Sequence, residues 1–394
     1  MAMTVLLTLG RLPKGLELAR CLHEAGHRVL VADPFSLHLC KPSRAVSRSF
    51  KVPAPATDQS GFLSALADIV RREGVDLVIP VSEEVLHAAR LSAHLTCDAI
   101  VLCPPFEALL ELHDKQAFPQ RVAAAGLRAP ETVLGDDPTA SALMQTGPTV
   151  AKGRFGCSGA KLAFHAQGAT LPGAQANADW VVQRRVEGRE VCTQAFCRDG
   201  QLLGHVTYRG LIHSGTVAVC FEQIDAPEIE AWTRQFVAHI GYTGFIAFDF
   251  IVDEAGTPFV LECNPRLTSG IHFFDHASLA TAVCDPTSNQ PIELKPQKRF
   301  QEGHTALTQA YSQILRPRTY WATLKTMGSA RDVLWSSRDP LVFPLMTPMS
   351  WPVLKQVLFE GRNFGEAATL DIEWTGSGAQ ARPGEPAQLE ARAS

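Results

Sequence analysis

Hydrophobic residues near the start of the chain fall into short runs separated by a helix-like stretch. Residues 4–9 form an apolar run that ends at Gly10, and residues 28–33 form a second run. Between them, apolar residues recur at helical spacing up to Gly26, where we expect the helix to end. A strand, a helix and a strand at this spacing predict a βαβ unit with parallel strands.

The same alternation continues for about one hundred residues. A helix, a strand, a helix and a strand are expected over residues 62–72, 75–81, 85–95 and 99–102. Pro104-Pro105 then interrupts the pattern. The sequence therefore predicts an open parallel-sheet α/β domain over residues 1–104.

After residue 105 the pattern changes to short strands around turns. Strand-like runs are expected over residues 148–152, 180–183, 189–197 and 202–208. Residues 221–240 have a mainly helical pattern, and residues 245–264 contain two further apolar runs. Beyond about residue 290 the pattern weakens to amphipathic helical stretches interrupted by prolines. We therefore expect a first lobe over residues 105–188 and a second lobe over residues 189–290. A mainly helical extension over residues 291–375 and a disordered tail over residues 376–394 should follow.

Composition narrows the class of protein. The chain has 394 residues, of which 46% are hydrophobic and 19% charged, so several domains are expected. A net charge of −4 argues against a nucleic-acid partner, which requires a basic face. Apolar runs stay below the ~18 residues of a membrane span. Ten cysteines without a CxxC pair, and a start without a signal pattern, predict free thiols in a cytoplasmic protein.

The two apolar runs near residue 250 carry acidic residues in a particular register. If the connecting turn centres on Ala255-Gly256, position i pairs with position 511−i, so that Asp249 lies opposite Glu262. Opposed residues project from one face with their Cβ atoms ~5 Å apart. Asn264, two residues further on, shares that face. Two carboxylates this close favour a bound cation, and oxygen ligands suit magnesium, although a solvated hairpin fits the same residues.

A glycine-rich turn follows the strand-like run that ends at Lys152. The turn contains Gly153, Gly156, Ser158 and Gly159. Such a turn lets backbone N–H groups approach an anion such as a phosphate. Alone, it fits an ordinary glycine-rich hairpin equally well, and it is not a Walker A sequence.

Taken in chain order, these features resemble the ATP-grasp superfamily over roughly residues 1–285. The segments that carry the resemblance are Asp114-Lys115, Val150-Ala-Lys152 with its glycine loop, Gln183 to Glu190, and Asp249 followed by Glu262-Cys-Asn264-Pro-Arg266. The resemblance implies an open-sheet domain before a two-lobed ATP-grasp domain and a helical C-terminal extension. The fold class is thus α/β and α+β.

The resemblance also implies a role for each matched residue, with ATP and Mg²⁺ (or Mn²⁺) as cofactors. Lys115 and Lys152 look like the nucleotide lysines, on the phosphate and base sides. Gly156, Ser158 and Gly159 would belong to the phosphate loop, Gln183 to Val186 to the adenine-binding hinge, and Glu190 to the ribose site. Asp249, Glu262 and Asn264 look like metal ligands, and Arg266, with Arg209, would neutralise charge on the intermediate. Arg184 departs from the family, in which this position is commonly acidic.

In closer detail the chain resembles the ATP-grasp ligases that form mycosporine-glycine, and carboxylate-amine ligases generally. The supporting segments are residues 26–30, 46–55, 262–266 and 339–343. The resemblance implies phosphorylation of a carboxylate or enolate oxygen of a small acid, followed by attack of an amine such as an amino acid. It does not determine either substrate, because pocket residues vary freely among related ligases.

Several alternatives remain open from sequence. The same nucleotide site serves carboxylation or carbamoyl phosphate formation, and a catalytically silent ATP-binding protein fits it too. A nicotinamide-dependent oxidoreductase, suggested by the first βαβ unit and Asp33, lacks two fingerprint glycines after Gly10. His272 and His276 fit pocket lining or packing better than a metal site. The apolar segment 341–359 fits core packing, a homodimer contact or a membrane surface.

Overall fold

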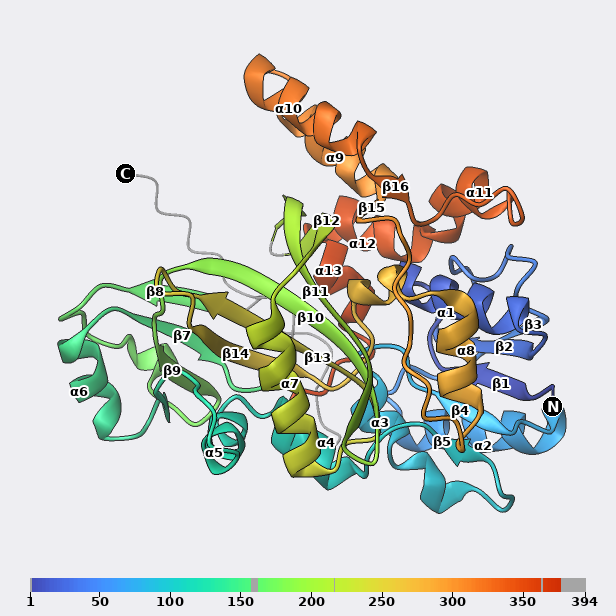
Figure 1. The fold of residues 1–394 in the computed structure, drawn as a ribbon, viewed down its shortest axis with the longest axis horizontal. Coiled ribbons are helices and arrows are strands. Elements are labelled where there is room, and N and C mark those ends of the chain that lie inside the picture. The colour runs from blue at the N-terminus through green and yellow to red at the C-terminus, as the bar shows by residue number, and fades with distance from the viewer. Residues whose placement is uncertain (1, 157–161, 216, 363, 377–394) are drawn as a thin grey trace.

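The N-terminal domain is built on a five-stranded sheet with all strands parallel, in the order β3-β2-β1-β4-β5. The computed structural model describes residues 2–156, 162–215, 217–362 and 364–376. The strands are β1 (Thr4–Leu7), β2 (Arg28–Asp33), β3 (Arg48–Lys51), β4 (Leu77–Ile79) and β5 (Ile100–Val101). The expected helices are α1 (Pro13–Glu24) and α2 (Gln59–Glu73), whereas the stretch 85–95 divides into α3 (Val85–Ala88) and the 3-10 helix η1 (Leu91–His94). The predicted open parallel sheet is confirmed (Figure 1).

Both faces of this sheet are buried, as is usual for parallel sheets. Val5 and Leu7 of β1 pack on one side, in a cluster with Phe273 from the later part of the chain. Leu6 packs on the other side against Phe62 of α2. The N-terminal domain therefore shares one core with elements more than two hundred residues further along the chain.

A seven-stranded sheet forms the centre of the molecule, in the order β14-β13-β10-β11-β12-β15-β16. Its strands are β10 (Arg189–Arg198), β11 (Gln201–Ser214), β12 (Val217–Ile224), β13 (Gly244–Val252), β14 (Pro258–Asn264), β15 (Arg299–Gln301) and β16 (Arg331–Asp332). Neighbours are antiparallel except β15 and β16. Helix α7 (Pro227–Ile240) covers one face, where Trp232 packs edge-on against Phe248 and Phe250.

The helix expected over residues 221–240 is wrong in its first part. Residues 221–224 belong to strand β12, and the helix begins only at Pro227. A proline disfavours helical backbone in the residue before it, and Ala226 accordingly has φ −153° and ψ 75°. Proline fits the first helical position, where no N–H is needed.

A smaller antiparallel sheet has the order β6-β9-β7-β8. Its strands are β6 (Thr132–Leu134), β7 (Thr149–Gly153), β8 (Leu162–His165) and β9 (Trp180–Arg184). Helix α6 (Thr139–Thr146) packs on it, and α4 (Phe106–His113) and α5 (Ala117–Ala124) precede it in the chain. A short 3-10 helix, η2 (Gly173–Gln175), lies before β9.

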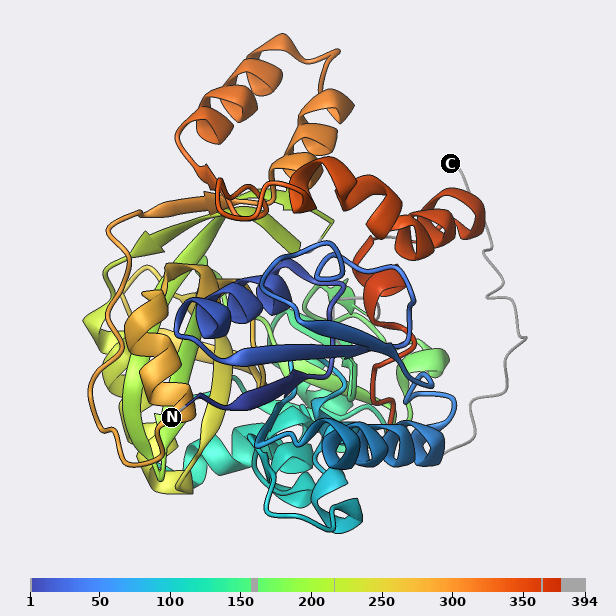
Figure 2. The same ribbon diagram turned by 90° about the vertical axis from the view of Figure 1, so that its right-hand side faces the viewer.

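The C-terminal region is mainly helical, as expected. After η3 (Ser269–Phe273) and α8 (His276–Cys284) come α9 (Gly303–Ser312), α10 (Pro317–Gly328), α11 (Val342–Met349), α12 (Trp351–Glu360) and α13 (Phe364–Thr369). Helices α9 and α10 form a hairpin that projects from the body (Figures 1 and 2). The chain then returns to the N-terminal domain, where Asp371 pairs with Arg11 at 2.7 Å. No helix of the described residues combines the length and apolar character needed to cross a bilayer.

Candidate active site

The hairpin of β13 and β14 brings the two predicted acids together. Asp249 pairs with Glu262, and Ala247 pairs with Asn264, as expected from the sequence. Closer to the turn, however, Phe250 pairs with Val260, so that the register shifts by one residue at Leu261. This β-bulge is what places Glu262 opposite Asp249, because an unbroken ladder from the turn would oppose Asp249 with Leu261.

Charges around the two acids push their pKa values apart. Burial, together with the charge of Glu262, raises the pKa of Asp249 to about 7. Burial also raises the pKa of Glu262, but the charges of Lys115 and Lys152 outweigh it and leave this pKa below its ordinary value. Lys115 Nζ lies 3.6 Å from Glu262 Oε2. The lysines therefore keep Glu262 ionised, whereas the charge of Arg266 near Asp249 does not outweigh burial and the charge of Glu262.

A chain of polar contacts leads from this pair to the N-terminal domain. Asn264 Nδ2 donates to Asp249 Oδ2 at 2.9 Å, and Arg266 Nη2 donates to Asn264 Oδ1 at 2.8 Å. Arg266 also forms an ion pair with Glu83, which is buried. Sequence reasoning missed Glu83. Its position directly after the expected strand 75–81 was the available signal, because ligands bind at the carboxyl ends of parallel strands.

Side-chain hydrogen bonds fix the start of the glycine-rich turn. Arg154 makes two hydrogen bonds to the Asp114 carboxylate, of 2.9 and 2.7 Å. Lys115 Nζ donates to the carbonyl oxygen of Gly156 at 2.8 Å. Gly156 has φ +105°, a conformation that only glycine adopts easily. These contacts hold Lys115 beside the turn, whereas Ser158 and Gly159, also expected here, lie outside the described residues.

Lys152 of β7 faces the acids from the small sheet. Burial lowers its pKa, while the charges of Glu262, Asp249 and Glu190 act in the opposite direction. These interactions place Lys152 within electrostatic reach of the hairpin. The predicted lysines thus approach the acid pair from two different segments.

The expected hinge joins the two sheets. Strand β9 ends at Arg184, and residues 185–188 lead into β10 of the large sheet. Gly188 has φ +157°, and a Cβ atom there would lie 2.2 Å from the carbonyl oxygen of Val252. Gln183 is buried and its Nε2 donates to Thr132 Oγ1 at 3.0 Å, so its side chain points into the small sheet.

Glu190 and Arg209, two other predicted site residues, lie on opposite faces of the large sheet. Glu190 stands two residues before Cys192, whose partner on β13 is Asp249, so Glu190 shares the face of the acid pair. Arg209 does not. Its neighbour Tyr208 is the residue that pairs with Cys192, so Arg209 projects from the opposite face, where it binds Glu222 at 2.7 Å. Arg209 therefore lies apart from the cluster.

The donor atoms of the hairpin fit a hard divalent cation. Asp249, Glu262 and Asn264 offer carboxylate and amide oxygens, the ligands that magnesium prefers. Burial holds the pKa of the adjacent Cys192 thiol well above its usual value, so this sulfur stays protonated. Within the described residues no group of three or more His, Cys, Asp or Glu is arranged around a metal position. A cation here would complete its shell with Asn264 and with oxygens of a ligand.

One protein family matches the segment that holds these residues. A family described as "ATP-grasp domain" matches residues 112–270, the segment that contains both lysines and the hairpin. A comparison with curated protein sequences finds no match.

Solved structures show the same fold at low sequence identity. N5-carboxyaminoimidazole synthetase from Staphylococcus aureus, solved with ADP, has a TM-score of 0.58 at 16% identity over 74% of this chain and 80% of its own. L-amino acid ligase from Bacillus licheniformis has a TM-score of 0.57 at 14% identity over 75% and 78%. The biotin carboxylase domain of Hydrogenobacter thermophilus 2-oxoglutarate carboxylase, solved with MgADP and bicarbonate, has a TM-score of 0.55 at 16% identity over 68% and 65%. The family match over residues 112–270 and the similarity to these solved structures together show that the chain has an ATP-grasp fold.

Proposed function

We propose that the protein is an ATP-dependent ligase that phosphorylates an oxygen of a small-molecule acid and joins the acid to an amine, releasing ADP and phosphate. The observation that carries this proposal is the opposed pair Asp249 and Glu262 with two lysines beside it, inside the segment that matches the ATP-grasp family. An idle acid pair in such surroundings would cost stability.

The residues around the pair suggest a division of labour. Bound Mg²⁺ would supply neutralisation of phosphate charge, held by Asp249, Glu262 and Asn264. Lys115 sits between Glu262 and the glycine-rich turn, which suits contact with phosphate oxygens. Lys152 of the small sheet would contact the base side of the bound nucleotide. Catalysis would then rest mainly on positioning and charge compensation.

Further contacts of the nucleotide come from the junction between the sheets. The backbone of the hinge near Val186 would bind adenine, while the Gln183 side chain is occupied by Thr132. Glu190, which is exposed on the face of the acid pair, would accept hydrogen bonds from the ribose hydroxyls. These assignments follow the order of the matched residues along the chain.

Arg266 is the residue we assign to the acceptor side. It joins Asn264 of the metal cluster to Glu83 at the carboxyl end of the parallel sheet. A guanidinium there would stabilise a transferred phosphoryl group or an anionic acceptor. Arg209 is left out of the proposed machinery because it is bound to Glu222 on the other face of β11.

The acceptor and the amine are the open part of the proposal. A carboxylate or enolate acid joined to an amino acid agrees with the resemblance to mycosporine-glycine-forming ligases and with the similarity to an L-amino acid ligase. The alternative is carboxylation, since other similar structures are named as carboxylases and one was solved with bicarbonate. The H. thermophilus domain is also named as a dimer, so a homodimer is proposed here and tested by sedimentation.

The test is ADP release by the purified protein with a panel of small acids and amines, followed by mass spectrometry of the product. Release that requires both an acid and an amine supports the ligase, whereas release that requires bicarbonate alone supports the carboxylase. We expect Glu262→Gln to reduce turnover by roughly a hundredfold or more. Glu254→Gln changes an exposed acid at the turn of the same hairpin and should leave turnover unchanged. Equal rates for Glu262→Gln and the wild-type protein would refute the metal assignment.

A further inference from the structure

Exposed hydrophobic side chains are concentrated on the C-terminal helices. Of the sixteen large hydrophobic residues exposed in the described part of the chain, eleven lie between residues 307 and 359. They are Leu307, Tyr311, Ile314, Leu315, Trp321, Trp335, Leu341, Phe343, Trp351, Leu358 and Phe359. We call residues 303–359 the C-terminal surface segment. Such a concentration on one part of a protein marks an interaction surface.

The α9–α10 hairpin is the most exposed portion of this segment. Leu315, in the turn between the two helices, is 93% exposed, and Ile314 beside it is 55% exposed. Helix α9 buries only Ala306 and Ala310, and helix α10 buries only Thr323. The hairpin projects from the body with its turn outermost (Figures 1 and 2). Aliphatic side chains held away from the core in this way are suited to insert into an apolar environment outside the protein.

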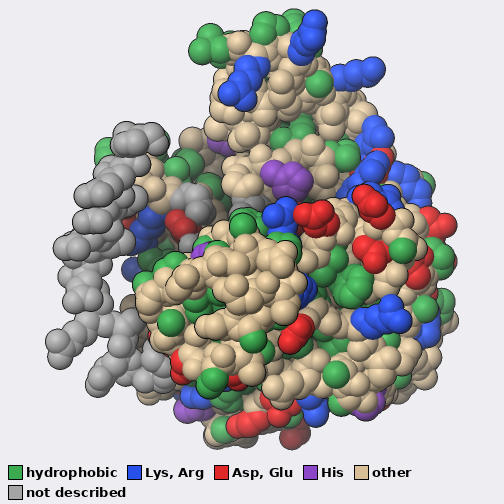
Figure 3. All heavy atoms as spheres, turned by 90° about the vertical axis from the view of Figure 1, so that its left-hand side faces the viewer, with side chains coloured by type: hydrophobic (Ala, Val, Ile, Leu, Met, Phe, Trp, Pro, Cys, Tyr) green, Lys and Arg blue, Asp and Glu red, His purple; other side chains and the backbone are tan. Residues whose placement is uncertain are grey.

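The exposed charged side chains of residues 303–359 are basic, although Arg338 is paired with Glu24 of α1 and the exposed Glu360 follows the segment directly. Its basic residues are all exposed: Arg316, Arg318, Lys325, Arg331, Arg338 and Lys355. Its two acids are not exposed. Asp332 accepts hydrogen bonds from the backbone of Gly303, Leu334 and Trp335, and Asp339 is paired with Arg20. On the projecting part, basic and hydrophobic side chains appear without acidic ones (Figure 3). This contrasts with the net charge of −4 of the whole chain.

Basic and aromatic residues also alternate along one helix face. Arg318, Trp321 and Lys325 are spaced three and four residues apart on α10, so they form one exposed stripe. Tryptophan with arginine and lysine is the combination found where proteins meet lipid headgroups, with aliphatic residues reaching below them.

We propose that the C-terminal surface segment docks the protein on an anionic lipid surface, with the turn at Leu315 entering the acyl region and the basic residues binding the headgroups. Charge complementarity selects this occupant over a second copy of the chain. A two-fold contact through this surface would oppose basic residues with basic residues. Nucleic acid would satisfy the charges but not the aliphatic residues, since bases stack on aromatic and guanidinium groups instead.

The test uses the full-length protein and vesicle co-sedimentation. We expect binding to vesicles of phosphatidylcholine with phosphatidylglycerol, little binding to phosphatidylcholine alone, and release by salt. The double variant Ile314→Ser, Leu315→Ser should weaken partitioning roughly tenfold or more. The triple variant Arg316→Glu, Arg318→Glu, Lys325→Glu should abolish the preference for the anionic vesicles.

Matched controls make the same changes on the other side of the molecule. Ile100→Ser in β5 and Arg128→Glu after α5 alter exposed residues far from the hairpin, and neither should change vesicle binding (Figure 1). ADP release in solution should stay unchanged in every variant, so that a failure here is separate from a failure of the ligase proposal. Absence of binding to both vesicle types overturns the proposal. The proposal is also overturned if the protein forms a dimer that the double variant dissociates. It is overturned as well if vesicles bind neither the wild-type protein nor the triple variant, and only the wild-type protein binds duplex or single-stranded nucleic acid.

Discussion

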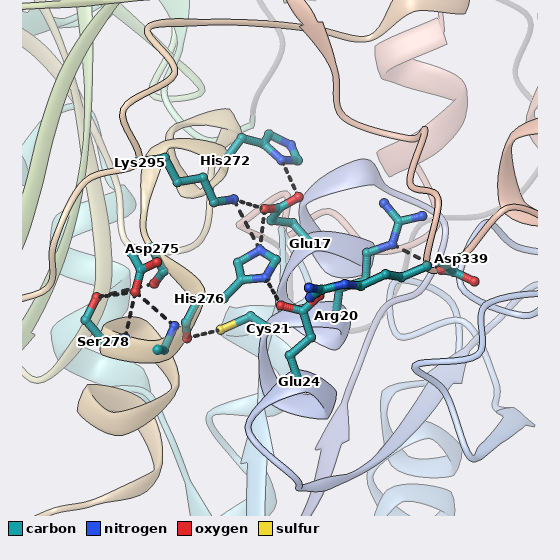
Figure 4. A network of polar contacts seen from close by, with 12 residues as sticks. Glu17, Arg20, Cys21, Glu24, His272, Asp275, His276, Ser278, Lys295 and Asp339 are labelled. Carbon is teal, nitrogen blue, oxygen red and sulfur yellow. Dashed lines mark hydrogen bonds and ion pairs between the residues drawn. The ribbon is translucent and has the colours of Figure 1, made fainter.

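A buried carboxylate in helix α1 connects the N-terminal domain to segments far along the chain. Glu17 Oε2 lies 3.0 Å from His272 Nδ1, and Glu17 Oε1 lies 2.8 Å from His276 Nε2 and 2.5 Å from Lys295 Nζ (Figure 4). His276 Nδ1 also contacts Glu24, which is more exposed. We predict that Glu17→Gln, which keeps the volume and removes the charge, destabilises the protein.

The magnitude follows from the burial of the partners. Removing one member of a fully buried ion pair costs about 3–5 kcal/mol. Because the side chains of Lys295 and His276 are 19% and 21% exposed, we expect a smaller cost than that of a fully buried pair, about 2–3 kcal/mol. A chain of 394 residues has an unfolding entropy of roughly 0.8 kcal/mol/K, so the thermal midpoint should fall by about 3 °C.

The effect depends on pH in a defined direction. Burial raises the pKa of Glu17, but His272, His276 and Lys295 outweigh it and hold this pKa well below its usual value. Its contribution is present above the ordinary glutamate pKa of ~4.3 and is lost as the pH falls through the lowered value. Burial lowers the pKa of His276, but Glu17 outweighs it and raises this pKa. The histidine contribution is present below ~6.5 and is lost as the pH rises through the raised value.

The assay is thermal unfolding of both proteins across this pH range. The difference in midpoint between wild type and Glu17→Gln should be largest near pH ~5–6 and should shrink toward alkaline pH. Glu24→Gln is the matched control, since a partly exposed ion pair is worth ~0–1 kcal/mol. Equal shifts for the two variants, or a difference independent of pH, would refute the reasoning.

Three further changes test other contacts. Glu83→Gln removes the partner of Arg266 and should lower turnover roughly tenfold, with ATP affinity measured by calorimetry unchanged. Lys152→Met should weaken ATP binding about tenfold or more, measured in the same titration, and an unchanged affinity would remove this lysine from the nucleotide site. Asp33→Asn breaks the buried pair with Arg11 and should cost about 3 kcal/mol of unfolding free energy, measured by urea denaturation.

Local patterns in the sequence predicted the parallel sheet and the acid hairpin, because period and turn residues are local properties. The pairing of Asp249 with Glu262 was nevertheless predicted from an incomplete premise. Next to the turn, Val252 pairs with Pro258, so the turn is centred on Ala255 and not between Ala255 and Gly256 as assumed. The bulge at Leu261 then restores the expected pairing of Asp249 with Glu262. A bulge depends on tertiary packing, so no count of residues from a turn could have revealed it.

Contacts between distant segments could not be predicted. Glu83 and Arg266 meet only when the parallel sheet packs against the hairpin, although each lies at the end of an expected strand. His272 and His276 are four residues apart but lie in different elements, the first in η3 and the second at the start of α8. Their common partner Glu17 is 255 residues before His272. The sequence around His272 and His276 gives no indication of this partner.

The hydrophobic clusters divide the elements around the site between two bodies. The N-terminal sheet and the large sheet share a core that contains both Val5 and Phe221, so they form one rigid unit that holds Glu83, Arg266 and the acid pair. The small sheet has a separate cluster around α6, in which Met144 and Val182 are buried. Lys115 belongs to the rigid unit, because Leu112 and Phe118 on either side of it pack in one cluster with Phe248 of β13. The small sheet, which holds Lys152, is therefore the body we expect to close on the rigid unit when a nucleotide supplies charge between them.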